Sequence, residues 1–186
     1  MFLFLGAALN AAAGFYWKGD GPDATGATLG VLGLACWLIG FADLYQRLRP
    51  ESPRVTAVLF PVTVFGVTGG MAFGVQSIHE VLFGASHART VELLDTEPLA
   101  ATVLYWICGP LFPLSLVALG VFLLRRRIVP ALIGVLLAAG GLAFPLSRIT
   151  REEILIHAVD LLLLVPFAYL GAWTRRRGDV PAVGRT

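Results

Sequence analysis

The stretch VTAVLFPVTVFGVTGGMAFGVQSIHEVLF, residues 55–83, decides the fold. Its first ionisable side chain is His79, so the residues before it are free of charge over more than six helical turns. A membrane-spanning helix needs about 20 consecutive, mostly apolar residues. Residues 55–83 exceed that length and can cross a bilayer with some tilt. The stretch therefore predicts a transmembrane helix.

Further apolar stretches of similar character occur on both sides of this one. The chain is 57% hydrophobic and only 14% charged, whereas soluble domains average about 25% charged residues. We predict an all-α, polytopic integral membrane protein whose six transmembrane helices form three helical hairpins in one bundle. The bundle occupies residues 1–174 and a cytoplasmic tail residues 175–186, with spans at about 2–17, 26–46, 55–83, 98–124, 128–147 and 153–174.

The arginines indicate how these spans are oriented. They gather after the second span, after the fourth span and after the sixth span, at Arg47, Arg49, Arg54, Arg125, Arg126, Arg127, Arg175, Arg176 and Arg177. Segments rich in Lys and Arg stay in the cytoplasm, so we predict that both termini are cytoplasmic. The expected location is a bacterial cytoplasmic membrane, crossed several times. The net charge of +2 is too small to indicate a nucleic-acid partner.

Most of the remaining ionisable residues lie at the opposite ends of the spans. Glu153, His157 and Asp160 are spaced i, i+4, i+7, which places them on one face of the last helix. A charge at bilayer depth costs about 2.5–3.5 kcal/mol unless it faces the bundle interior and finds a partner. We therefore expect this face to turn inward and to meet Arg148, His79 or Glu80.

This cluster predicts an outward-facing polar pocket with acid–base chemistry. Asp160 or Glu80 would exchange the proton and His157 would relay it, acting on a lipophilic substrate. The residues expected to bind the ligand or line the pocket are Arg148, Glu153, His79, Gln76, Tyr105 and Trp106. The combination resembles, only in kind, small integral-membrane cyclases that protonate an isoprenoid, and no residue role is carried over from them.

Other classes of function fit the same residues. The polar groups could form a purely structural network that locks the hairpins together, or the chain could be a membrane transporter or channel. It could also be an accessory subunit that packs against another membrane protein. The partners considered are therefore the lipid bilayer, a lipophilic small molecule, a second copy of the chain and another membrane protein.

The sequence does not specify a cofactor. His79, Glu80, His157 and Asp160 contain the nitrogen and oxygen ligands that zinc uses, and His79 with His157 could flank a haem, but no spacing fixes either set. The predicted site therefore contains no metal, and the cofactor is left open. Cys36 and Cys108 form no CxxC pair and are expected to be small buried hydrophobic residues.

Several local contacts are also predicted. Asn10, within the first span, should hydrogen-bond across helices, and the glycine pairs at 69–70 and 140–141 should let helices approach closely. Asp43 should pair with Arg47, four residues on. In the long outer loop, residues 90–98 are expected to form a short surface helix and His87 to be solvated.

Overall fold

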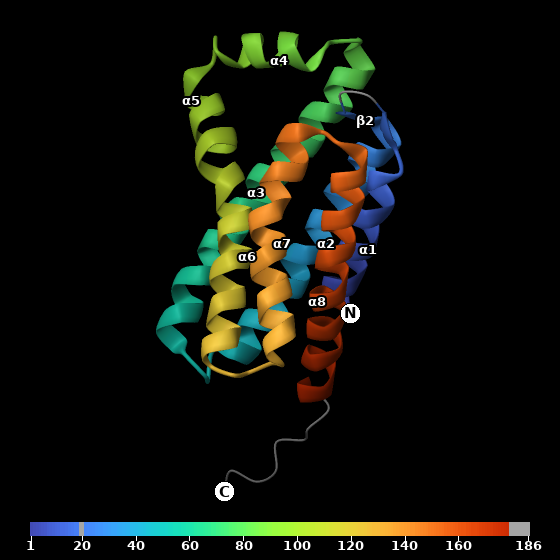
Figure 1. Cartoon of the computed structure of the whole chain (residues 1–186). Coiled ribbons are helices and arrows are strands. Elements are labelled where there is room, and N and C mark those ends of the chain that lie inside the picture. The colour runs from blue at the N-terminus through green and yellow to red at the C-terminus, as the bar shows by residue number, and fades with distance from the viewer. Residues whose placement is uncertain (19–20, 179–186) are drawn as a thin grey trace, which may run out of the picture.

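The part of the chain that the structure describes is a bundle of helices running along one axis, joined by short segments at its two ends (Figure 1). The structure is a computed structural model and describes residues 1–18 and 21–178. Its elements are α1 (Phe2–Gly14), β1 (Trp17–Lys18), β2 (Gly21–Pro22), α2 (Ala24–Leu48), α3 (Pro53–Phe83), α4 (His87–Leu94), α5 (Pro98–Ala100), the π-helical segment η1 (Ala101–Ile107), α6 (Cys108–Arg125), α7 (Ala131–Thr150) and α8 (Glu153–Gly178).

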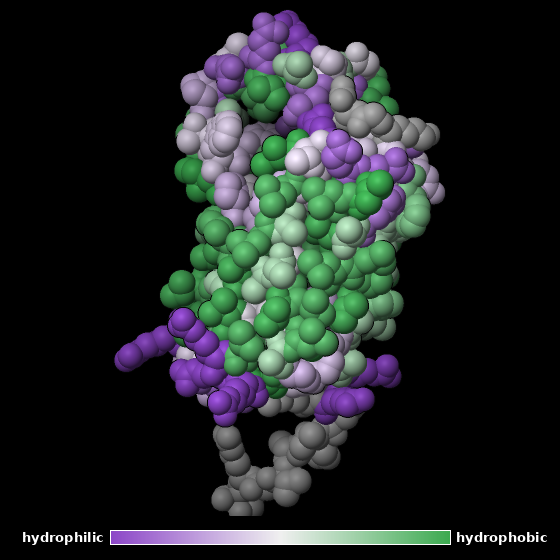
Figure 2. Space-filling view, viewed as in Figure 1, coloured by the Kyte–Doolittle hydropathy of each residue, from purple (hydrophilic) through white to green (hydrophobic). Residues whose placement is uncertain are grey.

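The long helices have the length and composition of membrane spans. Five segments among the described residues qualify: Ala24–Leu48, Pro53–Phe83, Pro98–Arg125, Ala131–Thr150 and Glu153–Arg176. On the face that Figure 2 shows, the middle of the bundle is apolar and hydrophilic residues lie at both ends. The chain is thus all-helical in its spans and has the character of a multi-pass membrane protein, as its sequence predicts.

The first predicted span is shorter than expected. α1 has 13 residues and ends at Gly14 rather than at residue 17, so it is about 20 Å long, against about 30 Å for the hydrocarbon core. The chain then pairs Trp17 with Pro22 in a two-stranded turn, and Asp23 caps α2 by accepting a hydrogen bond from the Gly26 amide at 3.0 Å. At the other terminus α8 continues past residue 174 to Gly178, and the remainder of the predicted tail lies outside the described residues.

The helices close into a ring. α1 packs on α2, α2 on α3, α3 on α6, α6 on α7, α7 on α8, and α8 returns to α1. Helices that follow one another along the chain are thus neighbours in space, which agrees with hairpins. α3 and α8 are not consecutive in this ring, a fact that decides which polar residues can meet.

The centre of the ring is filled by aromatic side chains. The Trp37 ring lies 5.3 Å from that of Phe112 and 4.9 Å from that of Phe167, measured between centroids. Phe41 meets Phe167 edge-on at 5.8 Å. Trp37, Phe41 and Phe167 have no exposed surface, and the Trp37 indole donates its N–H to the Leu3 carbonyl at 3.1 Å. The middle of the bundle is therefore a packed apolar core.

Glycines set the closest helix contacts. A β-carbon at Gly66 would lie 2.3 Å from the Phe112 backbone nitrogen, and one at Gly69 would lie 2.6 Å from the Cys108 carbonyl carbon. A β-carbon at Gly141 would lie 2.9 Å from the Pro113 carbonyl oxygen. Small residues allow such backbone approach where no hydrophobic effect drives helix association in lipid. The predicted role of Gly69 and Gly141 is confirmed.

The two ends of the bundle differ in chemistry. We call the end where α2 and α6 finish and α3 begins the arginine end, because it carries Arg47, Arg49, Arg54, Arg125, Arg126 and Arg127. At the opposite end, the α4 end, α4 lies across the bundle (Figure 1). The Ser86 hydroxyl caps α4 by accepting from the Arg89 amide at 3.2 Å, so this surface helix begins earlier than the predicted residue 90.

Candidate functional site at the α4 end

Asp160 is a buried carboxylate near the α4 end. It lies two turns into α8 and is only 2% exposed. Its Oδ1 atom accepts hydrogen bonds from Asn10 Nδ2 at 2.8 Å and from Arg148 Nη2 at 2.9 Å. The predicted pairing of Asp160 with Arg148 and the predicted cross-helix bond of Asn10 are both confirmed. Three helices, α1, α7 and α8, are thereby joined at one oxygen atom.

The second oxygen of this carboxylate is available. Oδ2 is buried and has no hydrogen-bond partner among the described residues. It lies beside Gly14: a β-carbon on that residue would be 3.1 Å from Oδ2 and 3.2 Å from His157 Nδ1. Oδ2 and the imidazole therefore both lie against Gly14 at the end of α1, where a β-carbon would already be tight. An unsatisfied buried acceptor costs about 1–3 kcal/mol, and more when charged, so Oδ2 is a strong acceptor for a donor brought to it.

His157 lies between the buried carboxylate and the protein surface. Its Nε2 atom is 3.9 Å from Glu153 Oε1, one turn nearer the helix start. The His157 side chain is 27% exposed and that of Glu153 is 70% exposed, so the exposure of these three side chains rises from Asp160 towards the start of α8. Phe15 covers the imidazole with ring centroids 4.7 Å apart. The predicted face formed by Glu153, His157 and Asp160 therefore runs from the protein surface to a buried carboxylate.

Arg148 is held between aromatic rings. Its guanidinium carbon lies 5.5 Å from the Trp17 ring centroid and 5.0 Å from that of Phe144, which are cation–π distances. The side chain is 24% exposed. The Trp17 Nε1 atom is buried and has no partner among the described residues. Sequence reasoning did not identify Trp17, Phe15 or Gly14 as site residues, because only the fold brings the end of α1 over α8.

Glu80 belongs to a second polar group, on α3 and α4. Glu80 Oε1 accepts from Gln76 Nε2 at 2.9 Å and lies 2.9 Å from His87 Nδ1. His87 is therefore not simply solvated as predicted; it ties α4 to α3. The hydrogen bonds and ion pairs found for Glu80 in the described chain involve Gln76 and His87, and those of Asp160 involve Asn10 and Arg148. The residues predicted as one pocket thus fall into two groups.

The other predicted residues take separate positions. Tyr105 packs edge-on against Phe73 at 4.8 Å on the α3 side. His79 is exposed and its ring lies 5.8 Å from that of Phe83. Trp106 is 78% exposed, so its ring faces away from the bundle interior, where it was predicted to wall the pocket. None of these three aromatic or imidazole rings is among the contacts of Asp160.

The donor set does not suit a metal ion. Within the residues that the structure describes, no three His, Cys, Asp or Glu side chains come together in a way that could hold one. The zinc alternative built on His79, Glu80, His157 and Asp160 fails because His79 and Glu80 lie on α3, which is not a neighbour of α8 in the ring. Of the two cysteines, Cys108 is buried as predicted and Cys36 is partly exposed; both are free thiols.

No protein-family model, curated protein or solved structure matches this chain. We call the group around the buried carboxylate the Asp160 site: Asn10, Gly14, Arg148, His157 and Asp160, with the exposed Glu153 at its outer edge. Chemically, this site combines a fixed carboxylate, an adjacent imidazole and a guanidinium held by aromatic rings.

Proposed function

We propose that the protein is a small membrane enzyme or binding protein that uses the Asp160 site for proton exchange with an amphiphilic substrate. The observation that carries the proposal is the buried Oδ2 atom of Asp160, which has no hydrogen-bond partner within residues 1–18 and 21–178 and lies beside His157. The proposal keeps the acid–base character predicted from the sequence and moves Glu80 out of the site.

The two oxygens of the Asp160 carboxylate can take different roles, one for orientation and one for proton transfer. Oδ1 is fixed by Asn10 and Arg148, which holds the carboxylate in one orientation. Oδ2 then presents a lone pair in a constant direction. A general base has to lie within hydrogen-bond reach of the proton it takes, and fixing it on packed helices lowers the cost of reaching that geometry.

His157 supports an exchange route to the exterior. One ring nitrogen lies against Gly14, next to Oδ2, and the other faces Glu153, so the imidazole can pass a proton by accepting at one nitrogen and releasing at the other. Distances such as the 3.9 Å between Nε2 and Oε1 are bridged readily by one water molecule. Glu153 would then exchange the proton with bulk water.

The surroundings support an amphiphilic substrate class. Glu153, the exposed residue of the site, begins α8 at the α4 end, and on the face that Figure 2 shows, the apolar middle of the bundle gives way to hydrophilic residues at its ends. A molecule with a polar head and an apolar body is concentrated at such a boundary. Arg148 has a partly exposed guanidinium that could orient an anionic head group. The bundle interior beyond the Asp160 site holds few buried polar side chains among the described residues, and those of Thr63 and Ser115 are already hydrogen-bonded to backbone carbonyls. This favours a one-sided site over the transporter alternative.

Membrane orientation belongs to the same proposal. The arginine end fits the cytoplasmic side by the positive-inside rule, with six membrane passes, both termini in the cytoplasm and the Asp160 site facing outward from a bacterial cytoplasmic membrane. α1 would be a short sixth span. The longer helices α2 and α8 would cover the part of the bilayer that α1 does not cross. Cysteine labelling at Glu153 in intact cells tests this orientation.

Infrared spectroscopy of the protein in lipid nanodiscs tests proton exchange at Asp160. As the pH falls we expect a carbonyl band of a protonated carboxylic acid that is missing in Asp160→Asn. In D2O this band should shift rapidly in the wild-type protein, and His157→Phe should slow the shift by about a hundredfold or more, the size of a general acid–base contribution.

Asp43→Asn is the matched control for this experiment. It removes a carboxylate at the arginine end, where Asp43 pairs with Arg47 at 2.8 Å, and should leave both the band and its exchange unchanged. A spectrum without an Asp160 band, or exchange that His157→Phe leaves as fast as before, would mean that the ion pair is only structural.

A further inference from the structure

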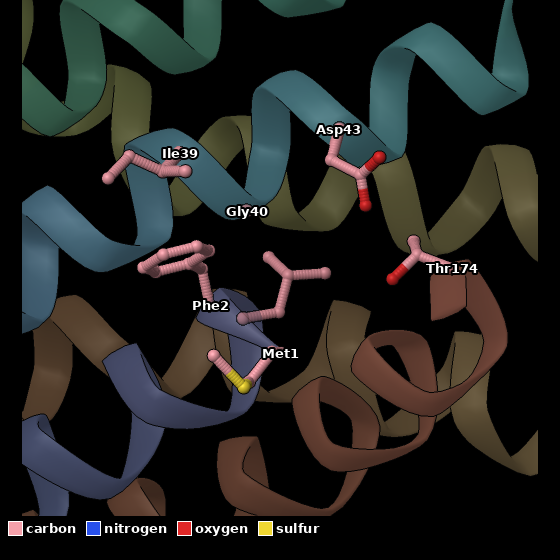
Figure 3. Close-up of a pocket in the computed structure, with 7 residues that line it drawn as sticks. Met1, Phe2, Ile39, Gly40, Asp43 and Thr174 are labelled. Atoms are coloured by element: carbon pink, nitrogen blue, oxygen red, sulfur yellow. The ribbon is translucent and has the colours of Figure 1, made fainter. Parts of the chain in front are cut away.

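Two grooves lie at the arginine end, far along the chain from the Asp160 site on α8. The first has a volume of about 270 Å³ and lies where Met1 and Phe2 of α1 meet Ile39, Gly40 and Asp43 of α2 and Thr174 of α8 (Figure 3). The second, of about 380 Å³, is lined by Met1, Phe4, Ala168, Gly171, Ala172, Arg175 and Arg176. Asp160 lines neither groove.

The lengths of the helices explain both grooves. α1 has 13 residues, whereas α2 has 25 and α8 has 26. α2 and α8 therefore extend beyond Met1 towards the arginine end, as Figure 1 shows for α8. The larger groove follows α8 from Ala168 to Arg176, and its small residues leave a slot against Phe4. Its volume falls within the range of about 300–1,000 Å³ that ligand sites occupy.

The charge of this region is positive at the groove mouth. Arg175 and Arg176 are exposed at the end of α8. The nearest acidic residue lining the grooves, Asp43, already pairs with Arg47 at 2.8 Å. The Thr174 hydroxyl is satisfied by donating to the Gly171 carbonyl at 3.0 Å. An apolar slot that ends in two arginines matches a molecule with an apolar chain and an anionic head.

We infer that this face of the protein binds an anionic phospholipid. One acyl chain lies in the larger groove along Ala168, Gly171 and Ala172, and the phosphate contacts Arg175 and Arg176. Basic pockets between membrane helices bind anionic head groups through this kind of charge match. The inference is independent of the proton exchange proposed for Asp160, because the two sites lie at different ends of α8.

Native mass spectrometry of the full chain in a neutral detergent tests this inference. The probes are phosphatidylglycerol and phosphatidylcholine with identical acyl chains. We expect one phosphatidylglycerol to bind in preference to phosphatidylcholine. The double variant Arg175→Gln/Arg176→Gln should lower that affinity by about 30-fold, since each arginine near a charged head group contributes roughly fivefold.

Two further variants separate the site from general surface charge. Arg125→Gln/Arg126→Gln removes two arginines at the end of α6 that line neither groove and should leave the affinity nearly unchanged. Gly171→Leu should block the slot, and its β-carbon would meet the Phe4 backbone nitrogen at an ordinary 3.6 Å. Equal losses from the two arginine pairs, undiminished binding to Gly171→Leu, or a dimer that occupies the groove instead of lipid would each overturn the inference.

Discussion

Arg148→Met is expected to lower the free energy of unfolding by about 3 kcal/mol or more. The substitution leaves the carboxylate of Asp160, 2% exposed, with Asn10 as its remaining hydrogen-bond partner. Removing one member of a buried ion pair typically costs about 3–5 kcal/mol, because the other charge stays buried without compensation. Equilibrium unfolding in mixed detergent micelles measures this change.

The double variant Arg148→Met/Asp160→Leu completes the test. Replacing both charges by apolar side chains should recover most of the loss, and Met can pack between the rings of Trp17 and Phe144. Arg89→Gln is the control at the same end of the bundle, since Arg89 pairs with Glu92 in an exposed setting and should contribute less than about 1 kcal/mol. Equal effects of Arg148→Met and Arg89→Gln would contradict the burial of the pair.

Gly66→Ala is expected to destabilise the bundle by about 3 kcal/mol. The added β-carbon would lie 2.3 Å from the backbone nitrogen of Phe112 and 2.5 Å from its α-carbon. Backbone atoms of a packed helix cannot move aside as a side chain can, so α3 and α6 must separate along their contact. Overpacking of this kind typically costs about 1–3 kcal/mol, and sometimes more.

Gly30→Ala, in the second turn of α2, provides the matched control. A β-carbon there would have no neighbour within 4 Å, so the substitution should only improve helix propensity, by up to about 1 kcal/mol. Thermal unfolding of the two variants side by side should therefore give shifts of opposite sign. A neutral Gly66→Ala would show that α3 and α6 do not approach as closely as the structure has them.

The class of fold could be predicted from sequence because lipid imposes it. Long uncharged stretches such as residues 55–83 become helices, since every backbone polar group must be satisfied inside the segment. The end of α1 was predicted less well. Gly14, Phe15 and Trp17 are apolar or small and extend the hydrophobic run, so the run by itself does not indicate that the helix stops at Gly14 and turns over α8.

The partners of the polar residues could be predicted only where one helix or two consecutive helices decide them. Arg148 and Asp160 lie on α7 and α8, which form a hairpin, and Asp43 and Arg47 are one turn apart; both pairs form. Glu80 was assigned to the same pocket because it lies at the same predicted depth. Depth follows from position along a span, whereas the order of helices around the ring does not. That order separates α3 from α8, and Glu80 contacts His87 of α4 instead.

An experimental density map of the protein in lipid nanodiscs tests the central claim most directly. We predict that Asp160 faces the interior between α1, α7 and α8, with Oδ1 held by Asn10 and Arg148. Density for a bound water molecule or the polar head of an amphiphile should connect Oδ2 to His157. A map in which Asp160 points towards lipid, or in which Oδ2 is occupied by a donor from the protein itself, would contradict the proposed site.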